Sequence, residues 1–185
     1  MEDLIGTQHP DRHLAPAEAI AALEAAVPGL TYHRRTSATP PDWARIEGTL
    51  GTRLPADFRL LAENYPSFGL GNFLHVPLPE PGREADWLGG VDHELETVRD
   101  WWEDEMSIGL RPHPAPGGLL PWASSLSGDV FLWTTAEPWL VTVASRNLEW
   151  WHYSGGAVQF LAEWVSGTLE PWALPELGFG LKAFS

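Results

Sequence analysis

Carboxylates gather between Glu80 and Glu105, and they are the side chains of this chain best placed to do chemistry. These 26 residues hold ten acidic side chains and two arginines, a balance of −8 within a formal net charge of −14. Negative charge at this density attracts a cationic surface and speeds its association. A pair such as Asp86 and Asp92 could instead act as a general acid and base, although an acidic chain offers many such pairs. The ordinary alternative is a solvated helix face, which is what most charge runs are.

Tryptophans in the same segment could anchor a partner. Trp87 lies in a stretch rich in proline and glycine that predicts a loop, and an aromatic ring in a loop is a common contact point in interfaces. Trp101 and Trp102 lie among the carboxylates farther along. We predict a partner-binding surface with one of these rings at its centre. It consists of Glu84, Asp86, Trp87, Asp92, Glu94, Glu96, Asp100, Trp101, Glu103, Asp104 and Glu105.

Sequence motifs of catalytic and metal sites are absent. The chain has no phosphate-binding Gly-x-x-x-x-Gly-Lys-[Ser/Thr], no Gly-x-Ser-x-Gly and no His-Glu-x-x-His. Gly69-Leu70-Gly71 precedes a predicted strand, which is the wrong context for a dinucleotide loop. The absence of cysteine excludes disulfides and thiolate metal sites. We therefore expect no catalytic residue, no cofactor and no metal.

Composition and charge narrow the class of protein further. Phosphate binding needs clustered Lys and Arg, so the charge of −14 argues against a nucleic-acid partner. The first six residues lack the pattern of a signal peptide, and no apolar run reaches membrane-spanning length. We expect a cytoplasmic protein without membrane contact. The oligomeric state is open, with a monomer favoured because strong net charge opposes self-association.

The elements that position these residues begin with three predicted helices. Apolar residues recur at i, i+3 and i+7 over residues 16–27, 40–50 and 55–65, with proline at each start. Thr39 is the expected cap of the second helix. Residues 30–35 are expected to form a short strand with Tyr32 pointing inward.

The acidic segment is predicted to be half loop and half helix. The glycines at 69 and 71 turn the chain into a strand over residues 73–76, and the prolines and glycines of residues 77–91 indicate a loop. Asp92 then caps a helix that carries Leu95, Val98 and Trp102 on its buried face.

The second half of the chain predicts strands and a closing helix. Aromatic and β-branched residues mark strands at 119–122, 130–134, 139–143 and 150–153, and helical spacing returns over 160–165. Helices followed by antiparallel strands predict an α+β domain, with helices packed against one mainly antiparallel or mixed sheet of about five or six strands. We expect residues 15–185 to form this single domain and residues 1–14 to form a loose arm.

Several short motifs occur in a characteristic order between residues 40 and 168. They are a Trp-x-x-Ile-Glu helix, a Leu-Gly and then a Leu-Pro-x-Asp-Phe segment, a Gly-x-Gly-x-Phe strand entry and a later Gly-Asp turn. This order resembles the SUKH superfamily, which contains bacterial immunity proteins and the fungal cell-wall-synthesis regulators of the SMI/KNR type. The resemblance rests on Trp43, Ile46, Glu47, Gly51, Leu54, Pro55, Phe58, Tyr65, Gly69, Gly71, Phe73, Trp122, Gly128, Asp129, Trp133 and Phe160.

The resemblance implies the same α+β fold and a role in binding. It implies no catalysis, because its recurring positions are mostly apolar residues, glycine or proline. Together with the acidic segment, it predicts an immunity protein that binds a basic toxin, such as a nuclease, and neutralises it by stoichiometric occlusion. The first alternative is a regulatory adaptor with several weak partners. The second is a hydrolase that uses the loop carboxylates.

Overall fold

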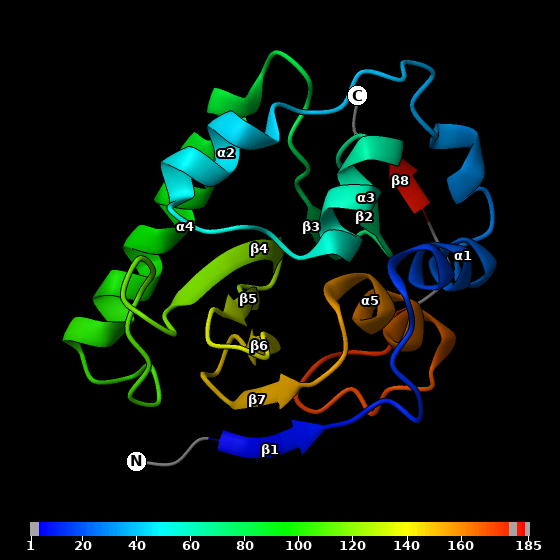
Figure 1. The fold of residues 1–185 in the computed structure, drawn as a ribbon. Helices are drawn as coiled ribbons and strands as arrows, with labels where there is room; N and C mark the ends of the chain where they lie inside the picture. Colours follow the sequence, from blue (N-terminus) through cyan, green and yellow to red (C-terminus); the bar gives the residue numbers. More distant parts are fainter. Residues whose placement is uncertain (1–3, 178–180, 184–185) are drawn as a thin grey trace.

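One mixed sheet runs through the part of the chain that the computed structural model describes, residues 4–177 and 181–183 (Figure 1). The strand order is β1-β7-β6-β5-β4-β3-β2-β8. From β2 to β7 the strands form an antiparallel meander, while β1 runs parallel to β7 at one edge and β8 pairs antiparallel with β2 at the other. The strands are β1 (Leu4–Gln8), β2 (Phe68–Leu70), β3 (Leu74–Val76), β4 (Leu119–Ser125), β5 (Val130–Thr134), β6 (Leu140–Ala144), β7 (Trp150–Tyr153) and β8 (Leu181–Ala183). The predicted α+β class with a single sheet is confirmed, but the sheet has more strands than expected.

Helices lie on both sides of the central strands. Three of them contact one another and pack over one side of the sheet (Figure 1): α1 (Pro16–Ala26), α3 (Ala56–Asn64) and α5 (Ala157–Ser166). The long helix α4 (Glu84–Glu103) contacts β4, and α2 (Trp43–Leu50) lies against α4. The predicted helices over residues 16–27, 40–50, 55–65 and 160–165 are thus present with small changes of their ends.

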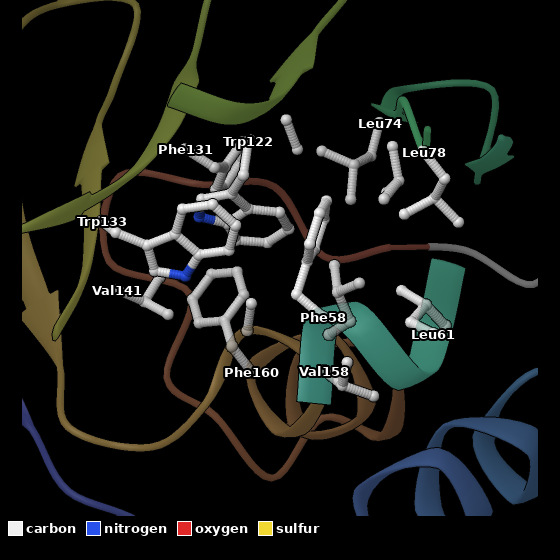
Figure 2. Close-up of a cluster of buried hydrophobic side chains, with 14 of the residues drawn as sticks. Phe58, Leu61, Leu74, Leu78, Trp122, Phe131, Trp133, Val141, Val158 and Phe160 are labelled. Atoms are coloured by element: carbon white, nitrogen blue, oxygen red, sulfur yellow. The ribbon is translucent and has the colours of Figure 1, made fainter. Parts of the chain in front are cut away.

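Successive side chains of each strand point to opposite faces of the sheet, so the core is divided between the two faces. On one face, Trp133 of β5 stacks on Trp122 with ring centroids 5.8 Å apart and meets the edge of Phe58 at 5.0 Å. Figure 2 shows this aromatic cluster between the sheet and helices α3 and α5. On the opposite face, Leu132 packs in a smaller cluster with Val98 of α4. Because both faces are covered, every residue of β5 is buried, which explains its continuous apolar sequence.

The N-terminal segment is not the loose arm that we predicted. Residues 4–8 form β1, in which Thr7 pairs with His152 of β7. Leu4 and Ile5 are 45% and 48% exposed, so this edge strand lacks the alternation of a half-buried strand. Its partner lies far along the sequence, and no local pattern could reveal that pairing.

Three local predictions in the first half of the chain were also wrong. Residues 30–33 form a short 3₁₀ helix, and Tyr32 is 89% exposed instead of pointing inward. The cap of α2 is Asp42, whose side chain accepts a hydrogen bond from the N–H of Arg45 at 3.0 Å. Gly69 lies within β2 and not in a turn.

Polar residues of the SUKH-like pattern stabilise connections inside the fold. Glu47 accepts hydrogen bonds from the N–H of Leu54 at 3.1 Å and from Arg59 at 3.3 Å, which ties α2 to α3. Asp129 is buried, and its carboxylate accepts a hydrogen bond of 2.9 Å from the N–H of Arg146, which joins two turns at one end of the sheet. These residues hold connections of the fold together.

Candidate functional site

The acidic segment forms one continuous helix, so the predicted loop over residues 77–91 was wrong beyond residue 83. Helix α4 begins at Glu84, and Asp92 lies in its middle instead of at its start. Gly89 and Gly90 lie within the helix, where a side chain would meet no atom within 4 Å. These glycines resemble a turn signal in the sequence, but long-range packing of the apolar face of α4 overrides them.

Trp87 and Glu84 are mainly buried, so neither is the exposed centre of a binding surface, although the edge of Trp87 lines a groove. Trp87 is 6% exposed, and its indole N–H donates to the carbonyl of Pro77 at 3.1 Å. Glu84 is 3% exposed and accepts hydrogen bonds of 3.0 Å from the N–H groups of Asp42 and Gly82. The hydrogen bond from Asp42 is the main reason why the pKa of Glu84 lies below its usual value. The prediction that these two residues are exposed contacts for a partner was therefore wrong, because neighbours outside the helix bury both of them.

Between the first turn and the middle of α4, three exposed carboxylates have nearby partners. Asp86 accepts from Arg83 at 2.9 Å, Asp92 from Arg99 at 3.0 Å, and Glu96 lies 3.5 Å from His93. These side chains are mostly in solvent, where such pairs contribute little to stability. The two arginines nevertheless reduce the local negative charge that a partner would meet, while His93 does so only when its imidazole is protonated.

At the C-terminal end of α4 the carboxylates lack such partners. Asp100, Glu103, Asp104 and Glu105 are exposed, and within the described residues none of them lies in an ion pair with Lys, Arg or His. The last turn contains no basic residue. Since the C-terminus of a helix carries partial negative charge, carboxylates here are destabilising. Glu105 also has a φ of 59°, a left-handed conformation that is unfavourable for a residue with a side chain.

Two apolar side chains are exposed among these carboxylates. Trp102 is 36% exposed and Met106 is 40% exposed. The guanidinium of Arg111 lies 5.3 Å from the ring centroid of Trp102 and supports one of its faces. Trp101 instead packs edge-to-face on buried Trp150, with centroids 5.5 Å apart, so it belongs mainly to the core.

We call this surface the acidic end of α4, and define it as Asp100, Trp102, Glu103, Asp104, Glu105 and Met106. The sequence identified its carboxylates. It did not identify Met106 or the supporting Arg111, because both lie in the loop after α4, whose path depends on tertiary contacts. The other predicted contact residues do not join this surface, since they lie on earlier turns of α4 or are buried.

A groove separates α4 from strands β3 and β4. Its volume is about 190 Å³, and most of its lining is apolar, including Pro77, Trp87, Val91 and Pro121. Glu94 lies at its wall and is half-buried. His75 faces the same groove, and burial lowers the pKa of its imidazole, while the charge of Glu94 acts in the opposite direction.

Metal ligands do not gather in the described part of the chain. Over residues 4–177, no three His, Asp or Glu side chains come together as metal ligands would. Among the helices that the structure describes, none combines the length and apolar character that a membrane span requires.

Comparison with known proteins adds no relative. No protein-family model matches the sequence, and neither curated proteins nor solved structures give a match.

Proposed function

We propose that this protein binds a basic protein and neutralises it by stoichiometric occlusion, as the immunity proteins of the SUKH superfamily do. The observation that carries the proposal is the acidic end of α4, where exposed Trp102 and Met106 lie among four carboxylates without a basic partner in the described residues. Tryptophan is enriched among the hot spots of protein interfaces, where the surrounding contacts exclude water. The toxin-directed role comes from the sequence resemblance.

The acidic end of α4 destabilises the fold, which favours a role in binding over a role in solubility alone. Carboxylates that serve only solubility are tolerated anywhere on a surface, and near a helix N-terminus they even stabilise the fold. Here they lie at the opposite end, next to a left-handed Glu105. Features that destabilise the fold persist most often where activity needs them.

The chemistry of this surface fits a cationic protein partner. Carboxylates steer a basic surface toward α4, and burial of Trp102 then supplies affinity. If the partner is a nuclease, the carboxylates would cover the basic cleft that it uses for phosphate. The proposal involves no cofactor, nucleic acid or membrane, and a cytoplasmic location for the complex agrees with the absence of cysteine.

Affinity capture from the source cells tests the proposal. Wild-type protein should retain a single basic protein with a Kd of about nanomolar, equivalent to roughly −12 kcal/mol. The triple variant Glu103→Gln, Asp104→Asn, Glu105→Gln should associate more slowly, with a weaker dependence of the rate on salt.

The control is the double variant Asp92→Asn, Glu96→Gln, which neutralises two carboxylates that already have a neighbouring Arg or His. It should retain most of the wild-type association rate. Equal rates for wild type and the triple variant at low salt would contradict the proposal. Capture of several weak partners would support the adaptor role instead.

A further inference from the structure

The groove between α4 and strands β3 and β4 has the dimensions of a site for one side chain. Its volume of about 190 Å³ lies below the range of roughly 300–1,000 Å³ that is usual for small-molecule and cofactor pockets. The hydrogen bond from Trp87 to the carbonyl of Pro77 fixes one wall. The opposite wall is strand β4 at Pro121 to Ser124. Because helix and strand backbones form both walls, the groove is a built feature of the fold.

The charge of the groove indicates which kind of side chain it would bind. Among its described lining residues there is no lysine or arginine, while Asp86 and Glu94 are both present. Asp86 is exposed and pairs with Arg83. Glu94 is half-buried and is not in an ion pair with Lys or Arg within the described part of the chain. The lining also holds the imidazoles of His75 and His93, and the charges of His75 and Glu94 act on each other. A guanidinium, which is always charged, would add beside Glu94 the permanent cation that the described lining lacks.

We propose that this groove receives an arginine side chain of the protein partner. The methylene stem would lie on Pro77, Val91 and the edge of Trp87, and the guanidinium would pair with the carboxylate of Glu94. Arginine fits better than lysine because its planar cation is weakly hydrated, stacks on aromatic rings and donates two parallel hydrogen bonds to a carboxylate. Assigning this arginine to the partner rests on the proposed function, and it adds a second contact on α4, N-terminal to the acidic end.

Short peptides test the site without the partner. The probe is N-acetyl-Gly-Arg-Gly-amide, with the lysine peptide and the citrulline peptide, which has the shape of arginine but no charge, as comparisons. We expect the arginine peptide to shift the NMR signals of the Trp87 indole N–H and of the Gly90 and Ser124 amides, with a Kd of about a millimolar. The citrulline and lysine peptides should bind about tenfold more weakly.

Variants on α4 complete the test. Glu94→Gln should weaken the arginine peptide about tenfold, since it removes the charged acceptor. Asp92→Asn, on the same helix, should leave binding unchanged, because neither Asp92 nor its partner Arg99 lines the groove. Equal binding of the citrulline or lysine peptide, or unchanged binding of the arginine peptide to Glu94→Gln, would overturn the inference. So would the absence of any NMR shift when the arginine peptide is present at roughly ten times the expected Kd.

The two proposals can fail separately. If the arginine peptide binds as expected but Glu103→Gln, Asp104→Asn, Glu105→Gln leaves partner association unchanged, the proposed function fails and the groove remains an arginine site. If the peptide does not bind while that triple variant slows association, the groove inference alone is wrong.

Discussion

The carboxylate of Asp57, in the first turn of α3, accepts a hydrogen bond of 3.0 Å from the backbone N–H of Val158, in the first turn of α5. Its other oxygen accepts from the N–H of Phe58 at 2.9 Å. Asp57 is 8% exposed, so a single buried side chain caps a helix that begins about 100 residues later. This contact explains why an aspartate occupies the Leu-Pro-x-Asp-Phe segment.

Removal of this carboxylate should destabilise the whole domain. Asp57→Ala leaves the Val158 N–H buried without its acceptor, and we expect a loss of about 1–3 kcal/mol in the free energy of unfolding. Urea unfolding measures the change. Asp42→Ala removes the exposed cap of α2 and serves as the control, with an expected loss of about 1 kcal/mol. An unchanged urea midpoint for Asp57→Ala would show that the contact is not stabilising.

The same residue predicts a pH dependence. Burial is the main cause that raises the pKa of Asp57, so the folded protein holds this proton to a higher pH than the unfolded chain, whose pKa is about 3.9. Its protonation therefore contributes stability that is fully present below about pH 4 and is lost as pH rises through the folded pKa.

In Asp57→Asn the side chain is uncharged at every pH, so this variant lacks the pH-dependent contribution of Asp57 to stability. The free energy of unfolding of wild type minus that of Asp57→Asn should therefore fall as pH rises above about 4. Urea titrations of both proteins over a pH series measure the difference. A difference that is constant with pH, or that grows, contradicts the assigned direction.

Gly156 is required because it lies against Asp57. A Cβ at Gly156 would lie 2.4 Å from Oδ2 of Asp57, so Gly156→Ala must displace the carboxylate and should lower the melting temperature. A Cβ at Gly48, in α2, would meet no atom within 4 Å, and Gly48→Ala should stabilise the domain by roughly 0.5–1 kcal/mol. Opposite signs for the two substitutions, measured by thermal unfolding, would support the contact. A neutral Gly156→Ala would contradict it.

Local patterns in the sequence predicted most helices and the central strands but not the edges of the sheet. Residues 130–134 and 150–153 are rich in aromatic and β-branched residues, and they form β5 and β7 as predicted. The pairing of β1 with β7 depends on a contact between distant segments and has no local signal. The start of α4 was missed for the same reason, because Glu84 is held there by Asp42, far away in the sequence.

The candidate site was predicted in part. The carboxylates at 100 and 103–105 are exposed at the C-terminal end of α4 and directly after it, as expected. Sequence alone could not separate them from Asp86, Asp92 and Glu96, because the ion pairs that distinguish the two groups depend on side-chain positions along the helix. It also could not reveal which tryptophan faces solvent.

From the sequence we expected Trp87 to contact a partner and Trp102 to lie on a buried face. Substitutions of these two tryptophans should show the opposite roles. Trp87→Ala removes a buried ring and should cost about 3–5 kcal/mol of stability. Trp102→Ala removes a partly exposed ring and should cost clearly less stability than Trp87→Ala, while it weakens partner binding by roughly 2 kcal/mol or more. Calorimetric titration and urea unfolding of both variants make the comparison. Full partner affinity in Trp102→Ala would remove this ring from the interface.

Glu105 offers a direct test of whether the acidic end of α4 trades stability for binding. Its φ of 59° is unfavourable for glutamate but suits glycine, and its charge opposes the helix dipole. Glu105→Gly should therefore raise the free energy of unfolding by about 1 kcal/mol and at the same time slow partner association.

Two further variants separate the causes. Glu105→Gln removes the charge but keeps the unfavourable backbone, so it should slow association as much as Glu105→Gly with a smaller gain in stability. Asn72→Gly, at a φ of 53°, is the backbone control, and its gain should be smaller because asparagine tolerates this conformation. If Glu105→Gly gains stability and loses no association rate, the glutamate is a tolerated defect and the binding surface must lie elsewhere on α4.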